Sequence, residues 1–67
     1  MFIKVFDDCE EMIFEGDSEE FLDENGWDED LEYVLSELDS NKGIKSIHYY
    51  ARNFGDIYTI YKTSQLL

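Results

Sequence analysis

Sixteen carboxylates lie between Asp7 and Asp39, and this stretch contains no lysine or arginine. Burying an unpaired charge is costly, so any fold built from this stretch must turn its acidic side chains towards water. From Ser40 to Leu67 the balance reverses, with four basic residues and only one acidic residue, Asp56. The formal charge of the whole chain is −12. We expect the carboxylates of the N-terminal half to form a single outward acidic surface.

The size and composition predict one folded domain, covering residues 1–67. Eleven aromatic residues and a hydrophobic fraction of 43% argue against disorder despite the charge. Cys9 is the only cysteine, so no internal disulfide forms, which fits a reducing compartment. No segment approaches the roughly 20 apolar residues of a membrane span. We expect a cytoplasmic protein with neither a membrane nor nucleic acid as a direct partner, because it lacks the cations that neutralise phosphates.

The N-terminal part predicts a hairpin followed by a short helix. Residues 2–6 are β-branched and aromatic and indicate a strand, and residues 12–14 indicate the return strand, ending at Gly16. A helical turn is the alternative for residues 12–14. Asp17 and Ser18 offer N-cap oxygens for a helix that ends at residues 25–26, with Phe21 and Leu22 facing inwards.

A second helix is predicted from an Asp28 cap to about Leu38. Its apolar residues recur at helical spacing and form a core-facing stripe: Leu31, Val34, Leu35 and Leu38. Trp27, just before the cap, is expected to fold onto the first turn as a hydrophobic staple. Residues 40–43 are turn formers that end this helix.

The C-terminal part predicts a second hairpin. Residues 44–52 alternate with a period of two, and residues 57–63 follow a loop at 53–56 that contains glycine. The resulting order is β-β-α-α-β-β. We predict an α+β fold in which a small antiparallel sheet has one or two helices packed on one face.

The sequence offers little for catalysis. A nucleophile needs a base to activate it, but His48 is the only histidine and lies on a different predicted element from Cys9. Paired carboxylates are abundant, but an acid–base site needs a shaped cleft that a domain of this size has little volume to build. Residues 23–30 are rich in oxygen ligands but do not fit the calcium-loop pattern. We predict no enzymatic activity, no metal site and no cofactor.

The predicted second helix carries a dense row of negative charge. Six carboxylates occupy residues 28–39, which is about one per 3 Å of helix and close to the spacing of roughly 3.4 Å between phosphates along one DNA strand. A solvated helix face that keeps a small protein soluble is the alternative interpretation. Against it, Glu37 and Asp39 are unfavourably placed near the C-terminal end of the helix dipole.

The short length, the run Asp7–Asp39 without basic residues, and the acidic segment at residues 28–32 resemble those of small nucleic-acid-mimic inhibitors from phages and mobile elements, including anti-CRISPR and antirestriction proteins. This resemblance implies a non-enzymatic inhibitor that occupies the basic nucleic-acid-binding surface of a nuclease or CRISPR effector in the cytosol of the host cell. An acidic interaction module, such as an antitoxin or a small regulatory subunit, is the alternative.

Partner contacts are expected from the two helices and from tyrosines on the open face of the C-terminal hairpin. The candidate partner-binding residues are Asp17, Glu19, Glu20, Asp23, Glu24, Asp28, Glu29, Asp30, Glu32, Glu37, Tyr50 and Tyr61.

Overall fold

The computed structural model describes residues 1–51 and 55–63. The elements in chain order are β1 (Phe2–Phe6), β2 (Met12–Asp17), α1 (Ser18–Glu24), α2 (Glu29–Ser40), β3 (Ser46–Ala51) and β4 (Asp56–Thr63). This order confirms the predicted β-β-α-α-β-β arrangement, with residues 12–14 in a strand. The predicted loop at 53–56 lies partly outside the described residues.

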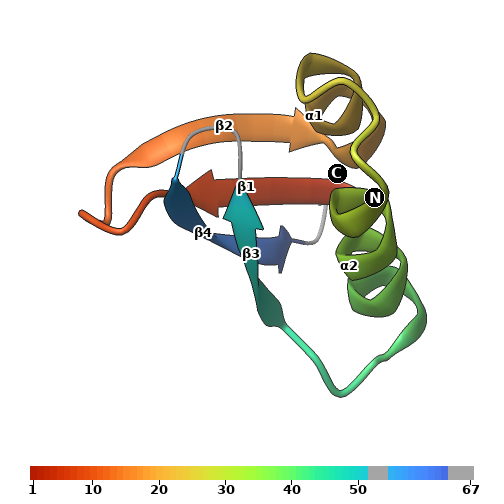
Figure 1. Ribbon diagram of the computed structural model, residues 1–67. Helices are drawn as coiled ribbons and strands as arrows, with labels where there is room; N and C mark the ends of the chain where they lie inside the picture. Colours follow the sequence, from red (N-terminus) through yellow and green to blue (C-terminus); the bar gives the residue numbers. More distant parts are fainter. Residues whose placement is uncertain (52–54, 64–67) are drawn as a thin grey trace.

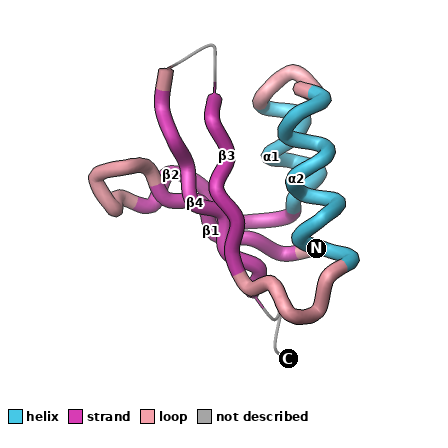
Figure 2. Tube along the Cα trace, turned by 60° about the horizontal axis from the view of Figure 1, so that its bottom comes forward, coloured by secondary structure: helices cyan, strands magenta, loops and turns pink. Residues whose placement is uncertain are grey.

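The strands form one antiparallel sheet in the order β2-β1-β4-β3 (Figure 1). The two hairpins therefore meet where β1 pairs with β4, and β2 and β3 are the edge strands. Both helices lie on the same side of the sheet (Figure 2). Helix α1 packs near β2 and helix α2 near β3. Within residues 1–51 and 55–63, no helix lies on the opposite face of the sheet.

The core lies between the helices and one face of the sheet. Its buried side chains are Ile3, Val5, Phe21, Leu22, Leu31, Leu35, Leu38, Tyr49, Ala51 and Ile60. In the predicted stripe of α2 only Val34 remains partly exposed. In β3 the predicted alternation is confirmed, because Tyr49 and Ala51 are buried whereas His48 and Tyr50 are exposed.

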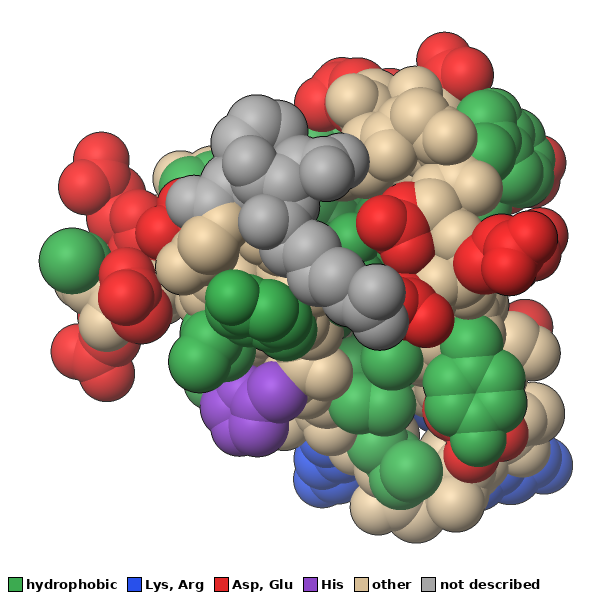
Figure 3. Space-filling model, viewed as in Figure 1, with side chains coloured by type: hydrophobic (Ala, Val, Ile, Leu, Met, Phe, Trp, Pro, Cys, Tyr) green, Lys and Arg blue, Asp and Glu red, His purple; other side chains and the backbone are tan. Residues whose placement is uncertain are grey.

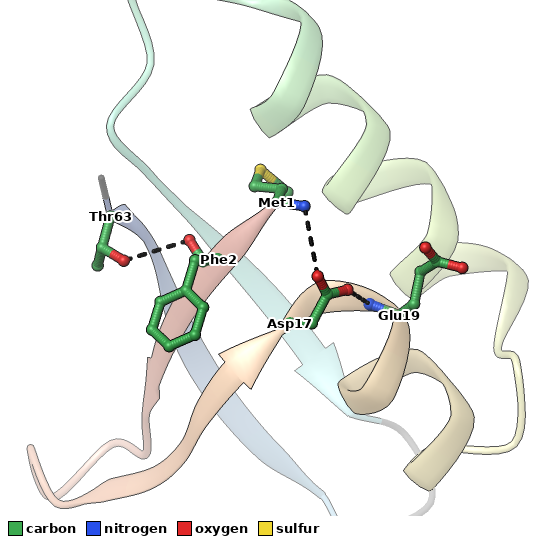
Figure 4. A network of polar contacts seen from close by, with 5 residues as sticks. All are labelled: Met1, Phe2, Asp17, Glu19 and Thr63. Carbon is green, nitrogen blue, oxygen red and sulfur yellow. Dashed lines mark hydrogen bonds and ion pairs between the residues drawn. The ribbon is translucent and has the colours of Figure 1, made fainter. Parts of the chain in front are cut away.

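Two aspartates cap the helices, as predicted. The Asp17 carboxylate accepts a hydrogen bond from the Glu19 N–H at 2.9 Å and lies 3.8 Å from the Met1 amino group (Figure 4). The Asp28 carboxylate accepts bonds from the N–H groups of Asp30 and Leu31 at 2.8 and 3.3 Å. Both caps satisfy N–H groups that have no partner within the helix.

The predicted Trp27 staple is wrong. The Trp27 indole N–H donates to the Asp23 carboxylate on α1 at 3.2 Å, and the side chain is 51% exposed. The Trp27 backbone has a φ of 56°, in the left-handed region, and its N–H donates to the Leu22 carbonyl. This tight turn after α1 directs the indole back to that helix rather than towards α2.

Lys62, on the helix-facing side of β4, caps the C-terminal end of α2. Its ammonium group donates to the Leu38 carbonyl at 2.8 Å and to the Asn41 carbonyl at 3.4 Å. The last turn of α2 has no basic residue of its own. The helix dipole favours a cation at this end. The cation is supplied by the sheet, from a residue that is distant in sequence from both Glu37 and Asp39.

Replacing Lys62 with methionine keeps the length of the side chain but removes the cation. We expect the free energy of unfolding to fall by about 1–2 kcal/mol, because carbonyls of α2 lose a charged donor. Urea denaturation followed by circular dichroism measures this change. The matched control is Lys45→Met, which removes the same charge from an exposed position. Equal destabilisation by both variants would show that net charge, and not the cap, is responsible.

None of the helices in the described part of the chain is long and apolar enough to cross a membrane.

Candidate acidic binding surface

The outer sides of α1 and α2 form one acidic surface, which we call the helix acidic surface. Neither helix contains a lysine or arginine, and the inward stripe leaves the carboxylates facing water. Figure 3 shows acidic side chains gathered over the helices, with lysines at the lower end of the same view. The surface consists of nine exposed carboxylates: Glu19, Glu20, Asp23 and Glu24 of α1, and Glu29, Asp30, Glu32, Glu37 and Asp39 of α2.

The expectation of a single surface for the whole N-terminal half is only partly correct. Asp7, Asp8, Glu10 and Glu11 lie in the β1–β2 turn, which projects from the end of the sheet away from the helices (Figures 1 and 3). We call these four residues the turn acidic cluster. Folding therefore divides the acidic run into two groups, because β2 returns the chain along the whole length of β1 before the helices begin.

A hollow between the helices brings together carboxylates that are distant in sequence. Its volume is about 400 Å³, and its acidic lining consists of Glu19 from α1 with Glu32 and Asp39 from α2. Met1, Leu22 and Leu35 form its apolar part. Asp39 was absent from the predicted contact residues. The sequence did contain a signal for including Asp39, because its spacing of seven residues from Glu32 places both side chains on one side of the helix.

Two of the predicted contact residues, Asp17 and Asp28, have structural roles. Each uses its carboxylate to cap a helix, so replacing either one would change the fold as well as the charge. Asp28 also acts on the buried Tyr49. Burial is the main cause that raises the pKa of Tyr49, and the negative charge of Asp28 and a hydrogen bond with it raise that pKa further. Tyr49 therefore keeps its proton near neutral pH.

The two predicted tyrosines are exposed on the open face of the sheet, as expected, but in different surroundings. Tyr50 lines a hollow beside Asp30 and Tyr33 of α2 and is therefore close to the helix acidic surface. Tyr61 packs edge-to-face on Phe6, with ring centroids 5.5 Å apart, in a hollow that also includes Asp7 and Glu10. Tyr61 thus lies beside the turn acidic cluster.

Cys9 and His48 lie on different elements, as the sequence predicted. Cys9 is exposed in the β1–β2 turn, where the negative charges of Asp8 and then Asp7 raise the pKa of its thiol. Activated cysteines have a lowered pKa, so this environment works against a nucleophile. The His48 ring shares a hydrogen bond with the Thr59 hydroxyl at 3.2 Å.

Possible ligand atoms of Asp7, Asp8 and Cys9 lie within 4.8 Å of one another. The Asp7 carboxylate already accepts hydrogen bonds from the N–H groups of Cys9 and Glu11. The closeness of these three side chains is therefore explained by the hydrogen bonds that form the turn.

The chain matches no protein-family model, no curated protein and no solved structure. Its function is accordingly inferred from the charge and shape of these surfaces.

Proposed function

We propose that this protein is a non-enzymatic inhibitor that acts in the cytoplasm as a DNA mimic. Its helix acidic surface binds the basic nucleic-acid-binding surface of a nuclease or CRISPR effector and excludes the nucleic acid. The observation that carries the proposal is the arrangement of nine exposed carboxylates on two adjacent helices that contain no cation. An arginine- or lysine-lined groove made for phosphates is the complementary partner.

The packing of the charged helices supports the proposal. Leu31, Leu35 and Leu38 are buried in the core and fix how α2 lies on the sheet, so its carboxylates all start from the outer side of the helix. The hollow lined by Glu19, Glu32 and Asp39 adds a place where carboxylates from both helices face one cationic side chain. Guanidinium groups pair with carboxylates in bidentate geometry, which would give orientation as well as affinity.

Like charges also have a cost for folding that a purely solubilising surface would avoid by mixing signs. Acidic neighbours three or four residues apart destabilise a helix by about 0.2–0.5 kcal/mol for each pair. On α2, Glu29 and Glu32 are such a pair. At the C-terminal end of α2, the Lys62 ammonium group bonds to carbonyl groups, so it stabilises the end of the helix without pairing with its carboxylates. A role in binding accounts for keeping the charges unmixed.

The test is capture followed by competition. The immobilised protein is mixed with lysates of bacteria that contain restriction and CRISPR systems, and bound proteins are identified at low salt and after washing at about 0.5 M NaCl. We expect a nucleic-acid-binding protein to be retained at low salt and released by the wash. In a purified mixture, duplex or guide-bound DNA should then compete with the inhibitor for that protein.

Capture of partners that are indifferent to both DNA competition and salt would contradict the proposal. An unrelated protein of similar net negative charge serves as the control for non-specific binding to cations.

An acidic protein–protein interaction module, such as an antitoxin or a small regulatory subunit, is the second candidate. It is favoured by the open sheet face, where Tyr50, Ile57 and Tyr61 are 56%, 51% and 43% exposed. Exposed aromatic side chains of this kind are common anchors in protein interfaces. With the captured partner, Tyr50→Ala or Tyr61→Ala should weaken binding more than loss of helix carboxylates does if this candidate is correct.

A further inference from the structure

Strand β3 presents an edge with regular, outward-facing hydrogen-bonding groups. The Lys62 N–H donates to the Lys45 carbonyl at 2.9 Å, and the register continues without a shift from that pair to Ala51 and Asp56. Because hydrogen-bonded and non-hydrogen-bonded pairs alternate in an antiparallel ladder, Ile47 and Tyr49 bond to β4. The N–H and C=O groups of Ser46, His48 and Tyr50 therefore point away from the sheet.

The other edge strand, β2, is less suited to receive a further strand. Its register with β1 shifts between Val5 and Phe6, which marks a bulge or irregularity. Bulges and charged residues are the usual protections of sheet edges. Strand β3 has no register shift, no proline and no acidic or basic residue within its bounds. An open edge of this regularity is a template for pairing with another segment.

A groove runs beside this edge. It has a volume of about 290 Å³ and lies between α2 and β3, with Asp30, Tyr33 and Val34 on the helix side. His48, Tyr49 and Tyr50 line the strand side. Glu37 lies seven residues after Asp30 and so continues the helix wall on the same side. A groove with a strand edge on one side and a helix on the other is the shape that binds peptides by strand addition.

Charge complementarity identifies the occupant. Asp30 is the acidic residue among those that line the groove, and the whole chain carries −12. A second copy of this chain would bring another −12 to the same edge and is disfavoured by repulsion. An extended segment with alternating basic residues has the opposite charge and the required period of two.

We propose that the groove between α2 and β3 binds an extended basic segment of the protein partner, which adds to the sheet as a fifth strand antiparallel or parallel to β3. The backbone of the segment bonds to Ser46, His48 and Tyr50, and its basic side chains lie towards Asp30 and Glu37 of α2. Its alternate side chains pack beside Tyr50 on the open face. This proposal rests on the proposed function only in requiring a basic protein partner.

The test uses the full chain and a synthetic peptide of eight residues that alternates lysine and valine. Amide hydrogen exchange and chemical shifts are measured by NMR with and without the peptide. We expect exchange at Ser46, His48 and Tyr50 to slow at least about tenfold, because free edge N–H groups become hydrogen-bonded. The control peptide has the same composition, with four lysines followed by four valines, and should give no such protection.

Two variants test the groove without changing the carboxylates of the helix acidic surface. His48→Pro removes an outward N–H without removing a bond to β4, a position where an edge strand tolerates proline. It should abolish the protection, whereas Glu15→Pro on the other edge should not. Tyr33→Lys alters the helix wall at a side chain that is 66% exposed and should weaken peptide binding with the fold unchanged. Circular dichroism checks that each variant is folded.

The groove proposal would be overturned by peptide binding without protection of the β3 amides, by equal binding of the control peptide, or by no binding. Protection already present in the free protein would show an occupied edge and would overturn it too. None of these results touches the proposed function, which is decided by the capture and competition experiment.

Discussion

A chain with Glu19, Glu32 and Asp39 all replaced by lysine is expected to bind its captured partner at least about 100-fold more weakly than the original chain. These residues line the hollow between α1 and α2, so the change removes three carboxylates from one site and places cations there. Loss and reversal of about 1 kcal/mol or more at each contact gives about 3 kcal/mol in total, which corresponds to the expected factor. Isothermal titration calorimetry at low salt measures the affinity.

The matched control replaces Asp8, Glu10 and Glu11 with lysine. It changes the net charge by the same amount, and all three residues are exposed in the turn acidic cluster. We expect this variant to bind within about threefold of the original chain, the small loss reflecting weaker long-range attraction. Asp17 and Asp28 are unsuitable for either set because they cap the helices.

Equal losses in the two variants would show that net charge alone attracts the partner and that the helix acidic surface has no special role. Unchanged binding in both would remove carboxylates from the mechanism and favour the aromatic sheet face. A salt titration adds a second measure, because the slope of affinity against salt should fall only for the helix variant.

Much of the fold was predictable because local signals agreed with one another. Asp17 and Asp28 each precede a helix whose apolar residues have helical spacing, and both act as caps. The period of two in residues 46–51 correctly separated Tyr49 from Tyr50. Such features depend on neighbours in sequence, where propensity and periodicity are informative.

The parts that could not be predicted depend on contacts between distant segments. The Lys62 ammonium reaches the Leu38 carbonyl across 24 residues, and no local pattern indicates that cap. The division of the acidic run into two groups, by contrast, follows from the predicted first hairpin, because β2 returns along β1 and leaves the turn at the end of the sheet away from the helices. Trp27 was misassigned because a left-handed backbone at a residue other than glycine is uncommon.

The location of the acidic residues was predicted at the level of elements rather than of individual contacts. The helix carboxylates were correctly placed on adjacent elements, since charged residues opposite an apolar stripe must face water. The hollow that includes Asp39 and the groove beside β3 arise from helix packing against helix and sheet. Sequence spacing alone does not fix those distances.

Replacing Leu38 with alanine is expected to remove at least about a third of the free energy of unfolding at low salt. Leu38 is fully buried, so the change costs about 3 kcal/mol in lost burial and cavity formation. The total stability of a domain of this size is only about 3–10 kcal/mol. Tyr33→Ala, at an exposed position of the same helix, is the control and should cost less than about 0.5 kcal/mol.

Salt should partly restore the Leu38→Ala variant, because the helix carboxylates repel one another and that repulsion is screened at about 0.5 M NaCl. The expected result is a midpoint of thermal unfolding that rises with NaCl concentration, measured by circular dichroism. The rise should be smaller when Leu38→Ala is combined with lysine at Glu19, Glu32 and Asp39, since fewer like charges then remain to be screened. A midpoint that does not respond to salt would mean that the carboxylates are too far apart to repel one another. The helices would then lack rows of closely spaced charge, and mimicry of a phosphate backbone depends on such rows.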